Sequence, residues 1–190
     1  GGIRAYEYDR TYRLDQTGFF YGGAAGTHIT RAAEDSGTNF RLNLSYKPGD
    51  SALLYAGWAQ GFRLGRLQGG LPAGVCDPNG DGIVDGTGIG IASTQRVDSD
   101  ELDSYEVGGK FELLDRRLSI AADIFLMEWT GVPVRVRPLA AGTGPCGGLS
   151  YFANAGEAQS EGVEFQANFQ ITEPLRVDFG GSWVHARLTE

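Results

Sequence analysis

The chain has 190 residues, a formal net charge of −8 and 30 glycines, roughly double the usual share of glycine. The acidic balance argues against nucleic-acid binding, which needs clustered Lys and Arg, so we expect no nucleic-acid partner. No run approaches the ~20 apolar residues of a membrane helix. High glycine, 11% aromatic residues and few helix-forming runs predict an all-β chain.

Seven segments alternate between apolar and polar residues with a period of two, which predicts strands with one apolar and one polar face. The first covers about residues 3–14, and a loop of about twenty residues follows it, over residues 15–37. The next two strands, at 39–47 and 51–62, are joined by a tight turn at 47–50, where Pro48-Gly49 favours a type II turn.

The remaining strands repeat this arrangement after a long polar loop at residues 63–100. Strands at 104–113 and 119–127 are joined by a tight turn at 114–117. A third long loop at 130–150, part of which (132–137) extends the preceding strand, leads to strands at 163–170 and 175–183 with a turn at 172–175. Long and short connections therefore alternate, so tight turns gather at one end of the sheet and large loops at the other.

The lengths of the strands and of their connections distinguish a β-sandwich from an outer-membrane β-barrel. Sandwich strands are usually about five or six residues long, whereas about ten residues let a tilted strand cross a bilayer. Short turns on one side and long loops on the other are typical of outer-membrane barrels. The sequence therefore predicts an antiparallel meander of about seven long strands, an incomplete slice of a transmembrane β-barrel with two unpaired edges.

The two faces of the predicted sheet would contact different surroundings. The polar face would line a wet lumen, with Arg41, Glu106, Lys110, Glu112, Asp123, Glu164, Arg176 and Asp178. The apolar face would contact outer-membrane lipid, with Phe40, Leu42, Leu44, Val107, Phe111, Ile124, Val163, Phe165, Phe169, Val177 and Phe179.

The segment CDPNGDGIVDG, residues 76–86, has the spacing of metal ligands. Its order matches the front of a calcium loop of the D-x-N-x-D-G type, although Gly88 stands where the bidentate Glu is usual. The predicted calcium ligands are Asp77, Asn79, Asp81, the backbone carbonyl of Ile83, and Asp85. The alternatives are an acidic, glycine-rich turn without metal, and an acidic face that excludes anions or attracts a cationic substrate. No nucleophile–base pair stands out, so we expect neither an enzyme nor a catalytic cofactor.

Cys76 and Cys146 lie in the loops after the third and fifth strands, on the same side of the predicted sheet. In a meander these loops are neighbours, which predicts a disulfide in an oxidising compartment. The alternatives are two unrelated loop thiols, or partners elsewhere in a longer chain.

Three segments resemble one family, the TonB-dependent outer-membrane receptors. LLYAGWAQGFRLGRL (53–67) resembles their YA-S-S-x-GFR-G region, and the segment at 98–125 resembles their E-x-S-x-x-Y-E-x-G-x-K strand with its return strand. YFANAGEAQSEGVEFQ (151–166) resembles their N-x-G-x-x-x-x-x-G-V-E segment. The three occur in the expected order, and the resemblance covers nearly the whole chain.

The resemblance implies a barrel of about 22 strands in the outer membrane of a Gram-negative bacterium. It implies energised uptake of a small scarce nutrient such as a ferric siderophore, haem or cobalamin, with TonB binding ahead of a plug domain. These residues show no plug pattern and no TonB-binding segment, so we expect residues 1–190 to be a partial barrel domain that does not transport alone. The alternatives are a secreted calcium-binding β-sandwich that recognises a carbohydrate or protein, and a passive porin.

Overall fold

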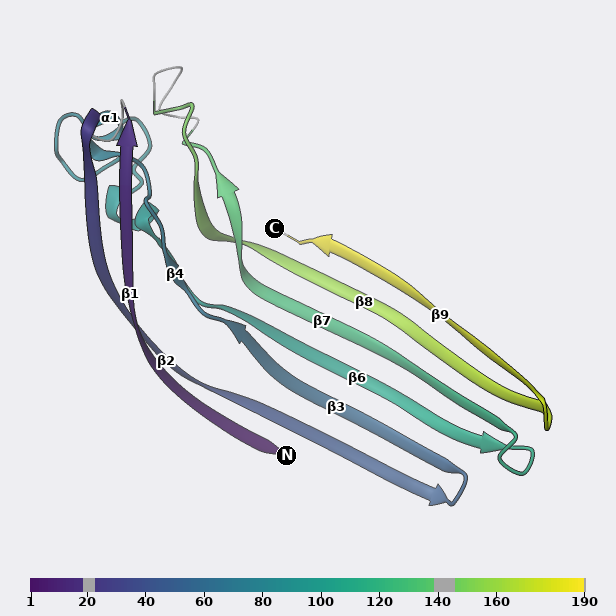
Figure 1. Ribbon diagram of the computed structural model, residues 1–190. Coiled ribbons are helices and arrows are strands. Elements are labelled where there is room, and N and C mark those ends of the chain that lie inside the picture. Colours follow the sequence, from purple (N-terminus) through teal and green to yellow (C-terminus); the bar gives the residue numbers. More distant parts are fainter. Residues whose placement is uncertain (19–22, 139–145, 190) are drawn as a thin grey trace.

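The computed structural model describes residues 1–18, 23–138 and 146–189 (Figure 1). Seven strands form one antiparallel sheet in the order β1-β2-β3-β6-β7-β8-β9, so each strand pairs with the next long strand along the chain. Their bounds are β1 Gly2–Gly18, β2 Gly23–Gly49, β3 Ala52–Arg63, β6 Asp100–Leu113, β7 Leu118–Val136, β8 Tyr151–Thr172 and β9 Leu175–Leu188. The sheet is open, with β1 and β9 at its edges. This confirms the predicted meander. In the described part of the chain the second sheet is a pair of two-residue strands, too small to form the other half of a sandwich.

The segment between β3 and β6 carries the remaining elements. Strands β4 (Arg66–Leu67) and β5 (Arg96–Val97) pair with each other, and between them lie helix α1 (Ala73–Cys76) and the 3₁₀ helix η2 (Ile91–Gln95). A membrane-spanning helix does not occur among the described residues.

The three tight turns lie together at one end of the sheet (Figure 1). The β6–β7 turn occupies residues 114–117 as predicted, and the β8–β9 turn occupies 173–174 between the paired residues Thr172 and Leu175. In the β2–β3 turn, Gly49 pairs with Ala52, so the turn residues are 50 and 51. The type II turn at 47–50 was therefore a wrong prediction. Pro48 has no N–H for the ladder, and the register shift between Tyr46 and Gly49 absorbs it as a bulge.

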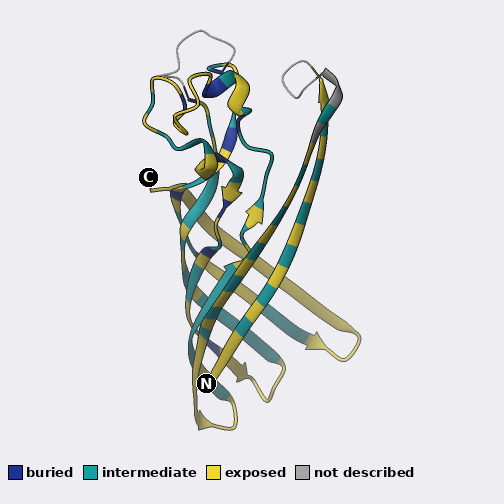
Figure 2. Cartoon of the chain, turned by 90° about the vertical axis from the view of Figure 1, so that its left-hand side faces the viewer, coloured by how far each residue is buried: buried dark blue, intermediate teal, exposed yellow. Residues whose placement is uncertain are grey.

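Two of the predicted loops are largely strand. The β1–β2 ladder continues without a long loop from Gly2↔Arg41 to Gly18↔Gly23, so the predicted loop at 15–37 was wrong. The β7–β8 ladder likewise reaches Val136↔Tyr151. Figure 2 shows the β1–β2 hairpin standing apart from the rest of the sheet at its upper end. Residues 23–37 of β2 are mostly small and polar, and their backbone hydrogen bonds to β1 do not require apolar alternation, which is why the pattern missed them.

The register puts the two predicted sets of side chains on opposite faces. Cross-strand partners point to the same side of a sheet. One row contains Leu44, Ala56, Val107, Ile124, Val163 and Trp183, and the next row, on the other face, contains Ser45, Tyr55, Gly108, Asp123, Glu164 and Ser182. Leu44 is 70% exposed and Phe179 64% exposed, so the apolar face needs a cover such as lipid. Contact of the other face with a lumen stays a prediction.

Candidate functional site at the loop end of the sheet

Residues 64–99, which we call the cap, form a small folded unit at the end of the sheet opposite the tight turns (Figures 1 and 2). Its core contains Leu71, Cys76 and Val84, packed with Cys146 and with Tyr151 at the start of β8. Among the described residues, every buried hydrophobic side chain lies in the cap or in the chain around Cys146 and Tyr151. The cap is therefore a packed unit rather than an unstructured polar loop.

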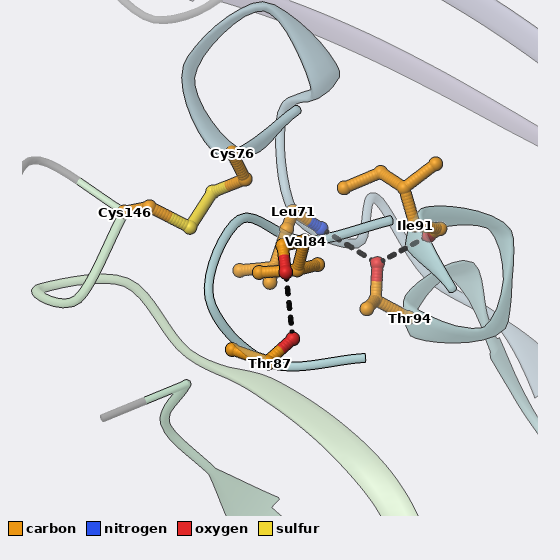
Figure 3. The surroundings of a disulfide bond; sticks show 7 residues. All are labelled: Leu71, Cys76, Val84, Thr87, Ile91, Thr94 and Cys146. Carbon is orange, nitrogen blue, oxygen red and sulfur yellow. Dashed lines mark hydrogen bonds between the residues drawn. A yellow bond between two sulfur atoms is a disulfide. The ribbon is translucent and has the colours of Figure 1, made fainter. Parts of the chain in front are cut away.

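Cys76 and Cys146 are joined by a disulfide, as predicted, with their Cα atoms 5.1 Å apart (Figure 3). Threonine hydroxyls satisfy backbone groups beside it: Thr94 Oγ1 accepts from Leu71 N at 3.0 Å and donates to Ile91 O at 2.7 Å. Thr94 is fully buried, so these hydrogen bonds replace water that the cap excludes. The disulfide thus fixes a well-ordered core to the β7–β8 side.

Residues 76–86, which we call the acidic segment, are held in their conformation by hydrogen bonds within the segment. The carboxylate of Asp77 accepts from Asp81 N and Gly82 N, both at 3.0 Å, and Asp81 Oδ1 accepts from Ile83 N at 2.8 Å. Asn79 Nδ2 donates to Asp81 Oδ2 at 3.0 Å. Such turns are ordinary for Asp and Asn beside glycines.

The structure gives no support for the predicted calcium site. The described residues contain no group of three or more His, Cys, Asp or Glu side chains that could hold a metal ion. Oxygens of Asp77, Asn79 and Asp81 accept from the segment's own N–H groups. The bridge between Ile83 and Gly90 is closed by Gly82 O and Val84 N and does not use the carbonyl of Ile83. Asp85 contributes its backbone to the segment: its N–H donates to Cys76 O at 2.8 Å.

Two side-chain amides attach the cap to β8. Asn154 Oδ1 accepts from Asp98 N at 2.7 Å, while its Nδ2 donates to Asp98 O at 3.0 Å and Gly131 O at 2.8 Å. Gln68 makes a similar pair with the backbone of Phe152, donating to its carbonyl at 2.6 Å and accepting from its N–H at 3.2 Å. Each amide supplies the donor and acceptor that a neighbouring strand would supply.

The two ends of the cap are held together where β3 and β6 leave the sheet. Arg63 pairs with the buried Asp100, and its guanidinium lies 5.0 Å from the centre of the Trp129 ring. At Gly65, a Cβ would lie 2.8 Å from Ser99 N and Val97 O, so only glycine fits there. The GFR-x-G segment is therefore explained by an ion pair and a close backbone approach.

The β1–β2 hairpin contacts the cap through Asp35. Asp35 Oδ2 accepts from Tyr8 Oη at 3.0 Å and from the hydroxyl of Ser99, and Arg10 donates to Gly65 O. The β2–β3 ladder ends at Arg41, and Asp35 lies six residues before it in the chain. Asp35 is therefore outside the strand predicted at residues 39–47. The Ser99 hydroxyl, followed by that of Tyr8, lowers the pKa of the Asp35 carboxyl.

The eight predicted lumen residues lie on β2, β6, β7, β8 and β9, spread along one face of the sheet rather than gathered in one site. Arg176 pairs with Asp178 at 2.9 Å, and Glu112 pairs with Arg116 at 3.2 Å. Asp123 and Glu164 are direct cross-strand partners. The contact residues of the cap, above all Asp35, Arg63, Gln68 and Asn154, were not predicted, because a single polar residue in a strand carries no local signal of its partner.

A curved meander with tight turns at one end, long excursions at the other and one exposed apolar face defines the wall of a transmembrane β-barrel. The family model described as "TonB dependent receptor-like, beta-barrel" matches residues 1–189. The chain belongs to this family. Members of the family are outer-membrane proteins of Gram-negative bacteria, so the chain is located in the outer membrane. The family consists of receptors and transporters rather than enzymes.

The chain is 26% identical over 151 residues to a probable TonB-dependent siderophore receptor, PiuA of Acinetobacter baumannii, covering 80% of this chain and 17% of the relative. Its fold is similar to the crystal structure of PiuA from Acinetobacter baumannii, with 20% identity and a TM-score of 0.65 over 99% of this chain and 23% of the other. The ferric yersiniabactin uptake receptor FyuA from Yersinia pestis gives 14% identity and a TM-score of 0.68 over 98% and 24%. The chain thus spans a quarter or less of the length of these relatives.

Proposed function

We propose that this chain forms part of the barrel wall and the outer mouth of a receptor that takes up a ferric siderophore or a similar scarce nutrient. The printed descriptions of PiuA and FyuA support the siderophore class. Haem and cobalamin receptors share the barrel and are the alternatives within the family. Energy would come from TonB, through a plug segment that these residues do not include.

The observation that carries the proposal is the cap. A disulfide and two amide pairs hold it beside the loop end of the barrel wall, and an ion pair joins β3 and β6 at its two ends. A loop that is ordered before the ligand arrives loses less conformational freedom on binding, which favours affinity. A passive pore has no need for such an ordered surface at its entrance.

The polar face of the sheet would form the wall against the plug and the nutrient path. Residues of both signs, among them Arg41, Lys110, Glu106 and Asp123, share this face. Polar side chains on the inner face of a barrel stay hydrated or pair with other polar groups, whereas lipid would strongly disfavour them.

The test uses the full-length receptor expressed in a strain whose own iron receptors are deleted. We expect uptake of radiolabelled iron supplied as a ferric siderophore, lost on deletion of TonB. Replacing residues 69–94 by a short Gly-Ser linker should remove binding while leaving the barrel in the outer membrane, as checked by its heat-dependent mobility on gels. Uptake that persists without TonB would indicate the passive porin, and binding unaffected by loss of the cap would contradict the role given to it.

A further inference from the structure

Two consecutive cap residues are bound from opposite sides. The backbone of Asp98 is paired with the side chain of Asn154 on β8, and the hydroxyl of Ser99 donates to Asp35 on β2. In the sheet, β2 and β8 are separated by β3, β6 and β7. The dipeptide therefore connects two strands that have no ladder in common.

On the β2 side the contact is a network of hydrogen bonds. Ser99 Oγ accepts from Gly65 N at 3.0 Å and donates to Asp35, whose carboxylate also accepts from Tyr8 at 3.0 Å. Arg10 donates to Gly65 O, and its guanidinium lies 5.3 Å from the centre of the Tyr8 ring. Asp35 is the acceptor shared by the two hydroxyl groups, so its removal breaks the contact with Ser99 and leaves the Arg10–Gly65 hydrogen bond between the hairpin and the cap.

On the β8 side the backbone of Asp98 is held by one amide, which makes three hydrogen bonds beside the separate Gln68–Phe152 pair and the Cys76–Cys146 disulfide. Asn154 holds both backbone groups of Asp98 and also the carbonyl of Gly131 on β7. Gly131 has a φ of 72° and lies where the β7–β8 register shifts, so Asn154 also caps an irregular point of the ladder. An Asp at this position would keep the acceptor and lose both donated bonds.

We propose that Asp35 and Asn154 are positioning residues that act in series through Asp98-Ser99, so that the β1–β2 hairpin, the cap and the outer part of β7–β8 move as one unit at the mouth of the receptor. Contacts in series lose their coupling when either one is broken, and breaking the second adds nothing. The Arg10, Gln68 and disulfide contacts still hold the cap in place in each variant, so only the coupling through Asp98-Ser99 is removed. Two independent contacts would instead give additive effects. This conformational inference goes beyond the proposed function and does not depend on the nutrient.

The test measures the distance between the hairpin and β8 in the full-length receptor in nanodiscs. Spin labels on Thr11→Cys of β1 and Glu157→Cys of β8, both exposed positions, report the distance distribution by double electron–electron resonance. Cys76 and Cys146 are bonded to each other and do not take up label. We expect one narrow distribution in the parent, a clearly broader one for Asp35→Ala and for Asn154→Asp, and no further broadening in the double variant.

Two controls separate this result from general damage. Glu34→Ala removes a charge from the exposed neighbouring position and should leave the distribution narrow, and Asp35→Asn keeps the acceptor oxygen and should restore most of the order. If Asp35→Ala fails to assemble, Ser99→Ala breaks the same contact from the cap. Additive broadening in the double variant, or an unchanged distribution in the single variants, would overturn the proposal. Because no ligand is added, these outcomes are independent of whether the receptor binds a siderophore.

Discussion

Arg63 of β3 donates from Nη2 to Oδ2 of Asp100 on β6 at 2.6 Å and from Nε to the same oxygen at 3.0 Å, although only 3% of the Asp100 side chain is exposed. The two residues are also cross-strand partners at the last rung of the β3–β6 ladder. The ion pair therefore sits where both strands leave the sheet and the cap begins. A buried carboxylate is stable there only with its hydrogen-bond donors.

Arg63→Ala should loosen the base of the cap. It leaves the Asp100 carboxylate buried without its charged donor, which costs about 1–3 kcal/mol, toward the lower end because Arg63 itself is 56% exposed. Hydrogen exchange in the full-length receptor should then be faster at residues 96–102. Arg96→Ala is the matched control, because the Arg96–Asp98 pair is exposed on both sides and should contribute little. Equal effects of the two substitutions would mean that the burial of Asp100 is unimportant.

Loss of the disulfide should open the cap without unfolding the barrel. Chain-entropy estimates give about 4 kcal/mol for a bridge that spans 70 residues, and the flanking ladders reduce this figure because they already hold the loop ends together. In the Cys76→Ser, Cys146→Ser double variant, limited proteolysis should cut within residues 69–94 first, while the heat-dependent gel mobility of the barrel is retained. A cap that resists protease as well as the parent would show that its small core and amide pairs suffice.

Asp77→Ala should destabilise the acidic segment with or without calcium. Asp77 is 8% exposed, and its removal leaves the N–H groups of Asp81 and Gly82 without an acceptor from this side chain. The protease cleavage rate in residues 76–86 should rise, whereas Asp85→Ala, at an exposed position, should have little effect. We expect added calcium to leave the parent's cleavage rate unchanged. Protection by calcium that is lost in both variants would instead support the metal site predicted from the sequence.

Sidedness can be tested with two neighbouring residues of β8. Phe165 belongs to the apolar face, where its ring centre lies 5.7 Å from that of Phe179, and Gln166 points to the polar face. Phe165→Arg should cost about 2–4 kcal/mol near the middle of the membrane. Assembly of the full-length receptor into the outer membrane should therefore fall for Phe165→Arg and persist for Gln166→Arg. Equal tolerance at both positions would contradict the assignment of the two faces.

The contact between Asp35 and the cap should respond to acid in a defined range. Hydrogen bonds from Ser99 and Tyr8 lower the pKa of Asp35 in the folded chain, so their contribution is present above the ordinary value and is lost as the pH falls through the folded value. The Thr11–Glu157 distance distribution should stay narrow from neutral pH to about 4 and broaden below it. Asp35→Asn should show no such transition. Broadening that begins well above this range would contradict the assignment of the transition to Asp35.

The sequence alone determined the barrel wall. Between Phe40 and Trp183, the two faces of the sheet contact different surroundings. Because successive side chains of a strand point to opposite faces, apolar and polar residues alternate along each strand. Register follows from the same requirement, because a slip by one residue exchanges the faces. Two cysteines on the same side of a meander were likewise sufficient to predict the disulfide.

The conformation and the contacts of the outer end of the sheet are known only from the tertiary structure. The outer part of β2, residues 23–37, consists mostly of small and polar residues and has no apolar alternation, although its partner β1 does alternate. Asp35, Arg63 and Asn154 obtain their roles from partners 64, 37 and 56 residues away in the chain, and no local pattern encodes such a separation. Only the fold shows that the carboxylates of Asp77 and Asp81, whose spacing suits calcium, also accept from the N–H groups of their own segment, and calcium binding there stays a prediction.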